Sequence, residues 1–133
     1  MTPLVLVDTS GWICYFARKG YEEAKKAIGA LLDEDRAATC GPILNEPVPG
    51  ARDQREKEIL RQYFLGVHWL PVQDRHWHGA ADLAYELRRK GITPSAIDAL
   101  IATLAVDYQC TLLHRDSDFE RISKHSPLRT LPL

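Results

Sequence analysis

Leu4-Val5-Leu6-Val7 is an uninterrupted apolar run near the start of the chain, and it ends at Asp8-Thr9-Ser10. A short apolar run without alternation is typical of a strand that is buried on both faces. Strands of this kind belong to parallel sheets, which carry helices on both sides. We therefore expect a parallel α/β sheet whose first strand ends at an acidic side chain.

Apolar residues recur at helical spacing in four later segments. Amphipathic helices are predicted around Tyr21 to Leu32, Ile59 to Phe64 and Trp77 to Leu87. The strongest pattern runs from Ser95 to Asp107, where Ser95 is placed to cap the helix. Short helices are also expected after Ser10 and near Phe119.

Short apolar runs between these helices are predicted to be further strands. Because strands and helices nearly alternate, right-handed crossovers should give a three-layer α/β/α sandwich with a central, mainly parallel sheet. No repeat or long linker divides the 133 residues, so we expect one domain over residues 1–133. Residues 41–50 are rich in Gly and Pro and are expected to be irregular. The predicted strands are Ala37-Thr39, Val67-Leu70, Thr111-Leu113 and Arg129-Leu131.

The composition limits the classes of function. The net charge is -1, with 17 Lys and Arg against 18 Asp and Glu, so no basic tail indicates a polyanion partner. Three widely spaced cysteines without a CxxC pair argue against a disulfide framework or a zinc knuckle, and favour a reducing cytoplasm. Because the chain start lacks a basic region and a long apolar segment, we expect no signal peptide and no membrane span.

Acidic side chains stand where strands end or helices begin. Asp8 ends the first strand, Asp98 lies in the first turn of the last long helix, and Asp116 and Asp118 follow the strand at residues 111–113. The carboxyl ends of parallel strands and the starts of the following helices meet at one edge of a sheet, where ligands bind. We therefore expect these carboxylates to converge.

Each acid has a simpler explanation by itself, because Asp is a favoured helix cap and complements the helix dipole. Capping does not require crowding, however, and two carboxylates about 4 Å apart repel by roughly 4 kcal/mol at an effective dielectric near 20. A hard cation explains such a cluster better, and an all-oxygen site suits Mg²⁺ or Mn²⁺. Two such ions can activate water against a phosphodiester. The hydroxyls of Thr9 and Ser10 could support the metal, although capping explains them equally well.

Four short motifs follow one another along nearly the whole chain, and together they resemble the PIN-domain ribonucleases, in particular the VapC-type toxins. The resemblance implies a PIN-like fold in which Asp8, Glu46, Asp98 and Asp116 are catalytic metal ligands. It also implies that Asp118 is an accessory acid and that Ser10 contributes a hydroxyl. The motifs are Val7-Asp8-Thr9-Ser10-Gly11-Trp12, Glu46 before Gly50-Ala51-Arg52, Ser95-Ala96-Ile97-Asp98-Ala99-Leu100-Ile101-Ala102, and His114-Arg115-Asp116-Ser117-Asp118-Phe119.

The same resemblance implies a function and partners. The activity would be Mg²⁺- or Mn²⁺-dependent endoribonuclease cleavage of cellular RNA, by the toxin of a toxin–antitoxin pair. The protein would be a homodimer, and a cognate VapB-type antitoxin would cover the acidic cleft. Arg52 and Arg115 are candidates for RNA phosphate contacts, because guanidinium binds phosphate bidentately, although solvated surface roles explain them equally well.

Glu46 lies in a segment that departs from the family pattern, where relatives continue as a helix. The run here is Asn45-Glu46-Pro47-Val48-Pro49-Gly50. A proline pushes its preceding residue away from the α conformation and has no N–H to donate. A displaced Glu46 would weaken one metal position without altering the fold. The main alternative is therefore a catalytically weakened PIN-like module that binds RNA or a protein.

A Mg²⁺-binding receiver-like signalling domain is a second alternative, because it has a similar size and fold. Receivers need an acidic pair near the first strand and a late Lys, but Asp8 has no acidic neighbour and no Lys follows a late strand before the final helix. A haloacid-dehalogenase phosphatase would need an Asp two residues after Asp8, where Ser10 stands. Both readings are disfavoured.

Histidines and tryptophans complete the candidate residues. His76 and His78 lie two residues apart, a spacing that does not place both on one face of a helix, so we expect partly exposed structural roles for them. Trp12, Trp69 and Trp77 could stack RNA bases, but tryptophans in such segments are more often core residues.

Overall fold

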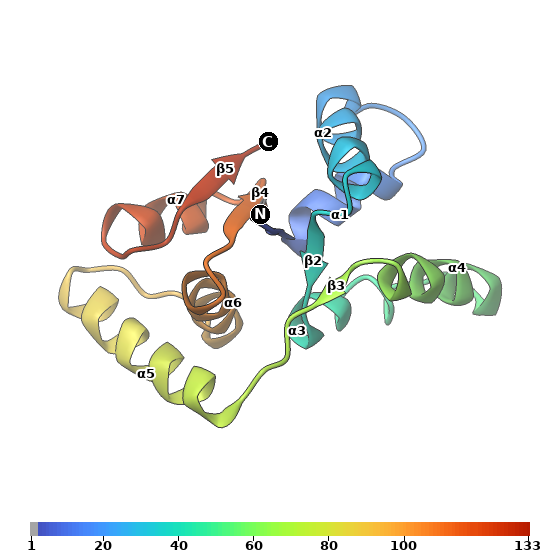
Figure 1. Cartoon of the computed structure of the whole chain (residues 1–133). Coiled ribbons are helices and arrows are strands. Elements are labelled where there is room, and N and C mark those ends of the chain that lie inside the picture. Colours follow the sequence, from blue (N-terminus) through green and yellow to red (C-terminus); the bar gives the residue numbers. More distant parts are fainter. Residues whose placement is uncertain (1–2) are drawn as a thin grey trace.

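The computed structural model describes residues 3–133, in which helices lie on both sides of a five-stranded sheet (Figure 1). The strand order is β3-β2-β1-β4-β5, and every pair of neighbouring strands is parallel. The prediction of a mainly parallel sheet between helical layers is therefore confirmed. The strands are β1 (Val5–Val7), β2 (Ala37–Thr39), β3 (His68–Trp69), β4 (Thr111–His114) and β5 (Thr130–Pro132).

Seven helices occur within residues 3–133, and they include all four long helices that the apolar spacing predicts. As expected, Ser95 caps the last long helix, because its Oγ accepts a hydrogen bond from the Asp98 N–H at 3.0 Å. None of the helices among these residues is long and apolar enough to cross a membrane. The helices are α1 (Thr9–Phe16), α2 (Glu22–Asp33), α3 (Gly41–Leu44), α4 (Gln54–Leu65), α5 (Asp74–Arg89), α6 (Ala96–Asp107) and α7 (Ser117–Lys124).

Different helix-to-helix contacts pack the two sides of the sheet. In Figure 1, α1 and α2 lie on one side of the sheet and α5 and α6 on the other. Trp12 of α1 is fully buried, as expected, and its ring packs edge-on against Phe64 of α4 at 5.2 Å between centroids. On the other side, α6 packs against both α5 and α7. A run of α6 residues fills the core there, namely Ala99, Leu100, Ile101, Ala102, Leu104 and Ala105.

Two tryptophans contradict the expectation that they belong to the core. Trp69 is 52% exposed and Trp77 is 53% exposed. Trp69 lies on β3, the edge strand of the sheet. Trp77 lies on α5 next to the buried His76 in the sequence. Periodicity predicted the helix correctly but not which of its aromatic residues is covered.

The order of the strands places a crevice at their carboxyl ends. From β1 the chain moves outward to β2 and β3, and then returns to the other side of β1 to form β4 and β5. With right-handed crossovers, the helices that follow these two halves cover opposite faces of the sheet. Ligands bind at such a reversal of strand order, outside the carboxyl ends of the strands. Here that point lies between β1 and β4.

Candidate metal centre

Asp8 is fixed at the carboxyl end of β1 by three hydrogen bonds. Its N–H donates to the carbonyl of Leu113 in β4 at 2.9 Å. Its Oδ2 accepts from the Ser10 N–H at 3.1 Å and from the Ser10 hydroxyl at 2.7 Å. The capping explanation for Asp8 is therefore correct. Its Oδ1 takes part in none of the hydrogen bonds found among residues 3–133, so the cap leaves one oxygen for another ligand.

Asp116 has the same arrangement at the start of α7. Its Oδ1 accepts from the Asp118 N–H at 2.9 Å, which caps the helix. Within residues 3–133 its Oδ2 has no hydrogen-bonding partner. Capping is thus compatible with metal binding for both aspartates, because the cap occupies one carboxylate oxygen and leaves the other without a hydrogen bond among residues 3–133.

Carboxylate oxygens from two helix starts approach one another closely. One oxygen each of Asp98, Asp116 and Asp118 lies within 4.8 Å of the others. Asp98 comes from the first turn of α6, whereas Asp116 and Asp118 come from the β4–α7 junction. Asp118 is exposed and also accepts from Arg121 at 3.3 Å, so it is the outermost of the three.

A cleft of ≈ 170 Å³ joins these carboxylates to the other predicted site residues. All four acids that the resemblance implies as ligands line it: Asp8, Glu46, Asp98 and Asp116. Apolar walls come from Ile13, Ile97, Ile101 and Pro42. Since one water molecule needs about 10 to 15 Å³ of such a cavity volume, the cleft has room for hydrated cations.

The crowding of carboxylates changes the acidity of Asp98. Burial raises the pKa of Asp98 to about 6, and the nearby charges of Asp116 and Asp8 add to the rise. Near neutral pH most of the Asp98 carboxylates are ionised, so the metal-free cluster carries unrelieved repulsion. A divalent cation would remove that repulsion, and an all-carboxylate donor set suits Mg²⁺ or Mn²⁺. The residues present therefore fit a hard divalent cation.

Glu46 follows α3 in a series of turns that continues through Pro47 and Pro49 to Gly50. The structure corrects the expectation that residues 41–50 are wholly irregular, because α3 forms with Pro42 in its first turn, where no N–H is required. Beyond Glu46, the Val48 N–H donates to the Leu44 carbonyl at 3.4 Å, and the Gly50 N–H to the Glu46 carbonyl at 3.2 Å.

The residues that alternate with Pro47 and Pro49 thus supply the N–H groups that keep this segment turning. Regular helix ends at Leu44, as the prolines suggest, but Glu46 is not carried out of the cleft. Its side chain is exposed at the rim. This geometry gives no support to the weakened-module alternative.

The two hydroxyl candidates have distinct structural roles. Ser10 bridges the two central strands, because its Oγ donates to Asp8 and accepts from the Arg115 N–H at 2.9 Å. Thr9 is buried, and its hydroxyl donates to the Ile43 carbonyl of α3 at 3.3 Å. Ser10 therefore orients the Asp8 carboxylate, and Thr9 ties the segment that carries Glu46 to α1.

The two arginine candidates do not line the acidic cleft. The Arg115 guanidinium lies 4.7 Å from the centre of the Tyr21 ring, a cation–π contact on the α2 side of the molecule. Arg52 is exposed just before α4, where its Nε pairs with Glu56 at 2.8 Å. The structure thus gives both side chains local partners and leaves their predicted phosphate contacts without direct support.

A buried histidine beside the cluster was missed by the sequence reasoning. His114 ends β4, is 1% exposed and hydrogen-bonds to the backbone of Asp116. The available signal was its position at the end of a buried strand, two residues before an acid. His76 is also 1% exposed, which corrects the expectation that it is partly exposed, whereas His78 is exposed. As expected, those two do not share a site.

The fold and the site define a class of protein: a doubly wound parallel α/β domain with a carboxylate cluster where the strand order reverses. Within this class, the chain belongs to the PIN-domain family, because a sequence model described as PIN domain matches residues 5–125. Two mycobacterial relatives are each 35% identical over 130 residues, which cover 95% of this chain and 96% of theirs. They are VapC ribonuclease Mb1587 from Mycobacterium bovis and ribonuclease VapC11 from Mycobacterium tuberculosis.

Solved structures share the fold at lower sequence identity. VapBC from Salmonella typhimurium bound to DNA aligns with a TM-score of 0.80 at 16% identity, over 98% of both chains. VapC20 from Mycobacterium tuberculosis, described as a Sarcin-Ricin loop cleaving toxin, aligns with a TM-score of 0.71 at 17% identity, over 94% of this chain and 98% of that one. These similarities extend over nearly the whole domain.

Proposed function

We propose that this protein is a metal-dependent endoribonuclease and the toxin of a toxin–antitoxin pair. The observation that carries the proposal is the approach of Asp98, Asp116 and Asp118 to within 4.8 Å of one another, beside a cleft that Asp8 and Glu46 line together with Asp98 and Asp116. Membership of the PIN-domain family and the similarity to relatives named as VapC ribonucleases support the same activity.

Asp8, Asp98 and Asp116 are the proposed direct metal ligands, because they share the cleft, and in two of them the cap leaves one oxygen without a hydrogen bond among the described residues. Glu46 adds a fourth carboxylate from the rim, and the exposed Asp118 is an accessory acid. Bound Mg²⁺ or Mn²⁺ would lower the pKa of a water molecule and neutralise charge on a phosphodiester. The carboxylates alone would repel RNA, so substrate binding should require the cation.

A cognate VapB-type antitoxin and a second copy of the chain are the proposed protein partners. A groove of ≈ 260 Å³ adjoins the acidic cleft and shares Thr9, Ile13 and Glu46 with it. A partner segment in this groove would cover the cleft on the Glu46 side. The three cysteines are free and buried, which fits a reducing cytoplasm, and we propose that location.

The first test of the function is removal of metal. Purified protein should cleave single-stranded RNA internally in Mn²⁺ or Mg²⁺, lose cleavage in excess EDTA, and regain it when the cation is restored. A cation at a hundredfold excess over its Kd should stabilise the fold by about 2.7 kcal/mol, which is several degrees in Tm. Gel analysis of labelled RNA and thermal unfolding measure the two effects. Cleavage that continues undiminished in EDTA would contradict the proposal.

Glu46→Gln tests the ligand at the rim. Because Glu46 is exposed and its segment turns without regular helix, we expect a partial loss, about tenfold in Mn²⁺ affinity, with full cleavage recovered at high Mn²⁺. Titration of the Mn²⁺-dependent Tm measures this. Glu58→Gln is the matched control, since Glu58 is an exposed acid on α4 outside the cleft. Equal Mn²⁺ responses in both variants would exclude Glu46 as a ligand.

A further inference from the structure

His114 lies behind the carboxylate cluster and has hydrogen bonds on both ring nitrogens. The Asp116 N–H donates to His114 Nδ1 at 3.0 Å, and His114 Nε2 lies 2.9 Å from Oε1 of Glu120. The same Glu120 oxygen accepts from the Thr130 hydroxyl of β5 at 2.7 Å. The ring packs against Phe119 at 5.5 Å between centroids. The imidazole is therefore held from β5, from α7 and from the Asp116 turn.

These contacts define the tautomer of the ring. A backbone N–H can only donate, so Nδ1 must present its lone pair to Asp116 and the proton must reside on Nε2, which donates to Glu120. The Thr130 hydroxyl and His114 hold the pKa of Glu120 below its usual range, so this carboxylate is a charged acceptor. A chain of hydrogen bonds thus runs from Thr130 and Glu120 through His114 to the backbone of Asp116.

The chain of bonds ends at a residue whose geometry matters for the site. Asp116 has extended backbone, with φ -129° and ψ 120°, and this conformation lets one oxygen cap α7 while the carboxylate approaches Asp98. Among residues 3–133, His114 Nδ1 is the acceptor for the Asp116 N–H, so this contact fixes the amide side of the turn. Groups behind a metal ligand commonly orient it in this way.

We propose that His114 is a positioning residue for the metal centre, which fixes the Asp116 carboxylate through the hydrogen bond from the Asp116 N–H to Nδ1. The inference rests on the proposed metal-dependent function. It assigns His114 no contact with metal or RNA. It predicts that the Nδ1 contact, rather than the burial of an imidazole, determines the affinity for the cation.

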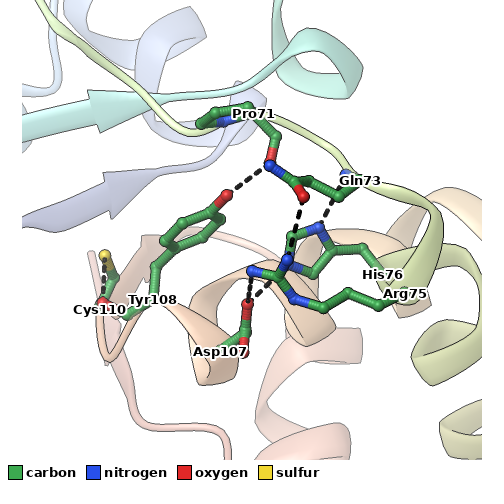
Figure 2. A network of polar contacts seen from close by, with 7 residues as sticks. All are labelled: Pro71, Gln73, Arg75, His76, Asp107, Tyr108 and Cys110. Atoms are coloured by element: carbon green, nitrogen blue, oxygen red, sulfur yellow. Dashed lines mark hydrogen bonds and ion pairs between the residues drawn. The ribbon is translucent and has the colours of Figure 1, made fainter.

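The protein contains an internal control for this proposal in His76 (Figure 2). His76 is equally buried, its Nδ1 accepts from the Gln73 N–H at 2.9 Å, and its Nε2 lies 2.7 Å from Oδ2 of Asp107. Arg75 also donates to that oxygen, at 3.0 Å. This network joins the start of α5 to the last residue of α6, whereas Asp98 lies in the first turn of α6. His76 thus repeats the bonding of His114 at the other end of α6.

The experiment compares His114→Asn with His114→Gln. Asn places its oxygen where Nδ1 was and can accept from the N–H two residues later, as in an Asx turn. Gln reaches toward Glu120 instead and loses the Asp116 contact. We expect His114→Gln to weaken Mn²⁺ binding by about 10- to 100-fold, and His114→Asn to stay within about threefold of wild type. Isothermal titration with Mn²⁺ alone gives the Kd, and RNA cleavage should recover in His114→Gln at high Mn²⁺.

Three further variants serve as controls, namely His76→Asn, His76→Gln and Asp98→Asn. Equal Mn²⁺ affinities for the two His114 variants would overturn the positioning role, and so would an equal loss in His76→Gln. If Asp98→Asn binds Mn²⁺ like wild type, the metal site itself is wrong, which is a separate failure. Should His114→Gln not fold, Glu120→Ala against Glu120→Gln decides, because only Ala removes the acceptor for Nε2. Weaker Mn²⁺ binding in Glu120→Ala alone supports the proposal, and equal binding overturns it.

Discussion

Asp98→Asn is expected to abolish RNA cleavage while leaving the fold intact. Asp98 belongs both to the group of oxygens within 4.8 Å and to the set of acids that line the cleft. Loss of an outer partner of a metal ligand already costs up to about a hundredfold in affinity or activity, so loss of this carboxylate should cost more. The α6 cap survives, because Ser95 binds the backbone N–H of residue 98, which Asn retains.

The same substitution should make the metal-free protein slightly more stable near neutral pH. Burial and neighbouring charges raise the pKa of Asp98 from 3.8 to about 6, so between these two pH values the folded protein holds a proton that the unfolded chain has released. That stability is present below about pH 4 and is lost as pH rises through about 6. Discounted for partial exposure and for the lost helix-dipole interaction, Asn should gain up to about 1 kcal/mol at pH 7.5.

Thermal unfolding in EDTA from pH 5 to 7.5 measures this difference, which should grow with pH. Mn²⁺ should raise the Tm of wild type but not of Asp98→Asn. Because the cation competes with the proton on Asp98, Mn²⁺ binding to wild type should weaken as pH falls below about 6. Wild-type cleavage rates in Asp98→Asn would show that Asp98 is not a ligand. A large loss of Tm in EDTA would instead indicate a structural role.

The convergence of Asp8, Asp98 and Asp116 could be predicted from sequence because it follows from topology. Strands that are continuous apolar runs pair in parallel, and their carboxyl ends then share one edge of the sheet. That reasoning needs only the order of the elements. Local apolar patterns and helix caps, which act within a few residues, also predicted β2 at Ala37–Thr39 and the start of α6 after Ser95.

Features that depend on contacts between distant segments could not be predicted in this way. The Pro47–Pro49 segment stays at the cleft because Thr9 holds the Ile43 carbonyl, a contact between residues 34 positions apart. The buried His76 is hydrogen-bonded to Asp107, which lies 31 positions later. Trp69 is exposed on β3, whose edge position is known only once the strand order is known. In each case tertiary packing decides among options that local propensity leaves open.

Asp8→Asn and Asp8→Ala should separate the two functions of the residue that ends β1. Asp8 Oδ2 caps α1 through the Ser10 N–H and also accepts from the Ser10 hydroxyl. Asn keeps an acceptor oxygen and caps about as well as Asp, so only the charge is lost. Ala removes the acceptor, so the Ser10 N–H and the Ser10 hydroxyl both lose this partner. We expect RNA cleavage to fall by more than about a hundredfold in both variants.

Stability should distinguish the pair. Asp8→Asn should unfold in urea like metal-free wild type, whereas Asp8→Ala should lose about 1 to 3 kcal/mol, because Asp8 is 6% exposed and the cap is largely desolvated. Asp53 provides the matched control, since its Oδ1 caps α4 through the Glu56 N–H at 2.8 Å and lies outside the cleft. Asp53→Ala should be destabilised by about 1 kcal/mol and still cleave RNA.

If Asp8→Asn retained wild-type cleavage, Asp8 would be a cap and nothing more, and the metal site would have to be built from the remaining acids. If Asp53→Ala lost cleavage as Asp8→Ala does, cap loss alone would explain both. The expected pattern, with cleavage lost in both Asp8 variants and stability lost only in Ala, requires two uses of one carboxylate. That is what the geometry offers, because Ser10 occupies Oδ2 while Oδ1 stays without a hydrogen-bonding partner among residues 3–133.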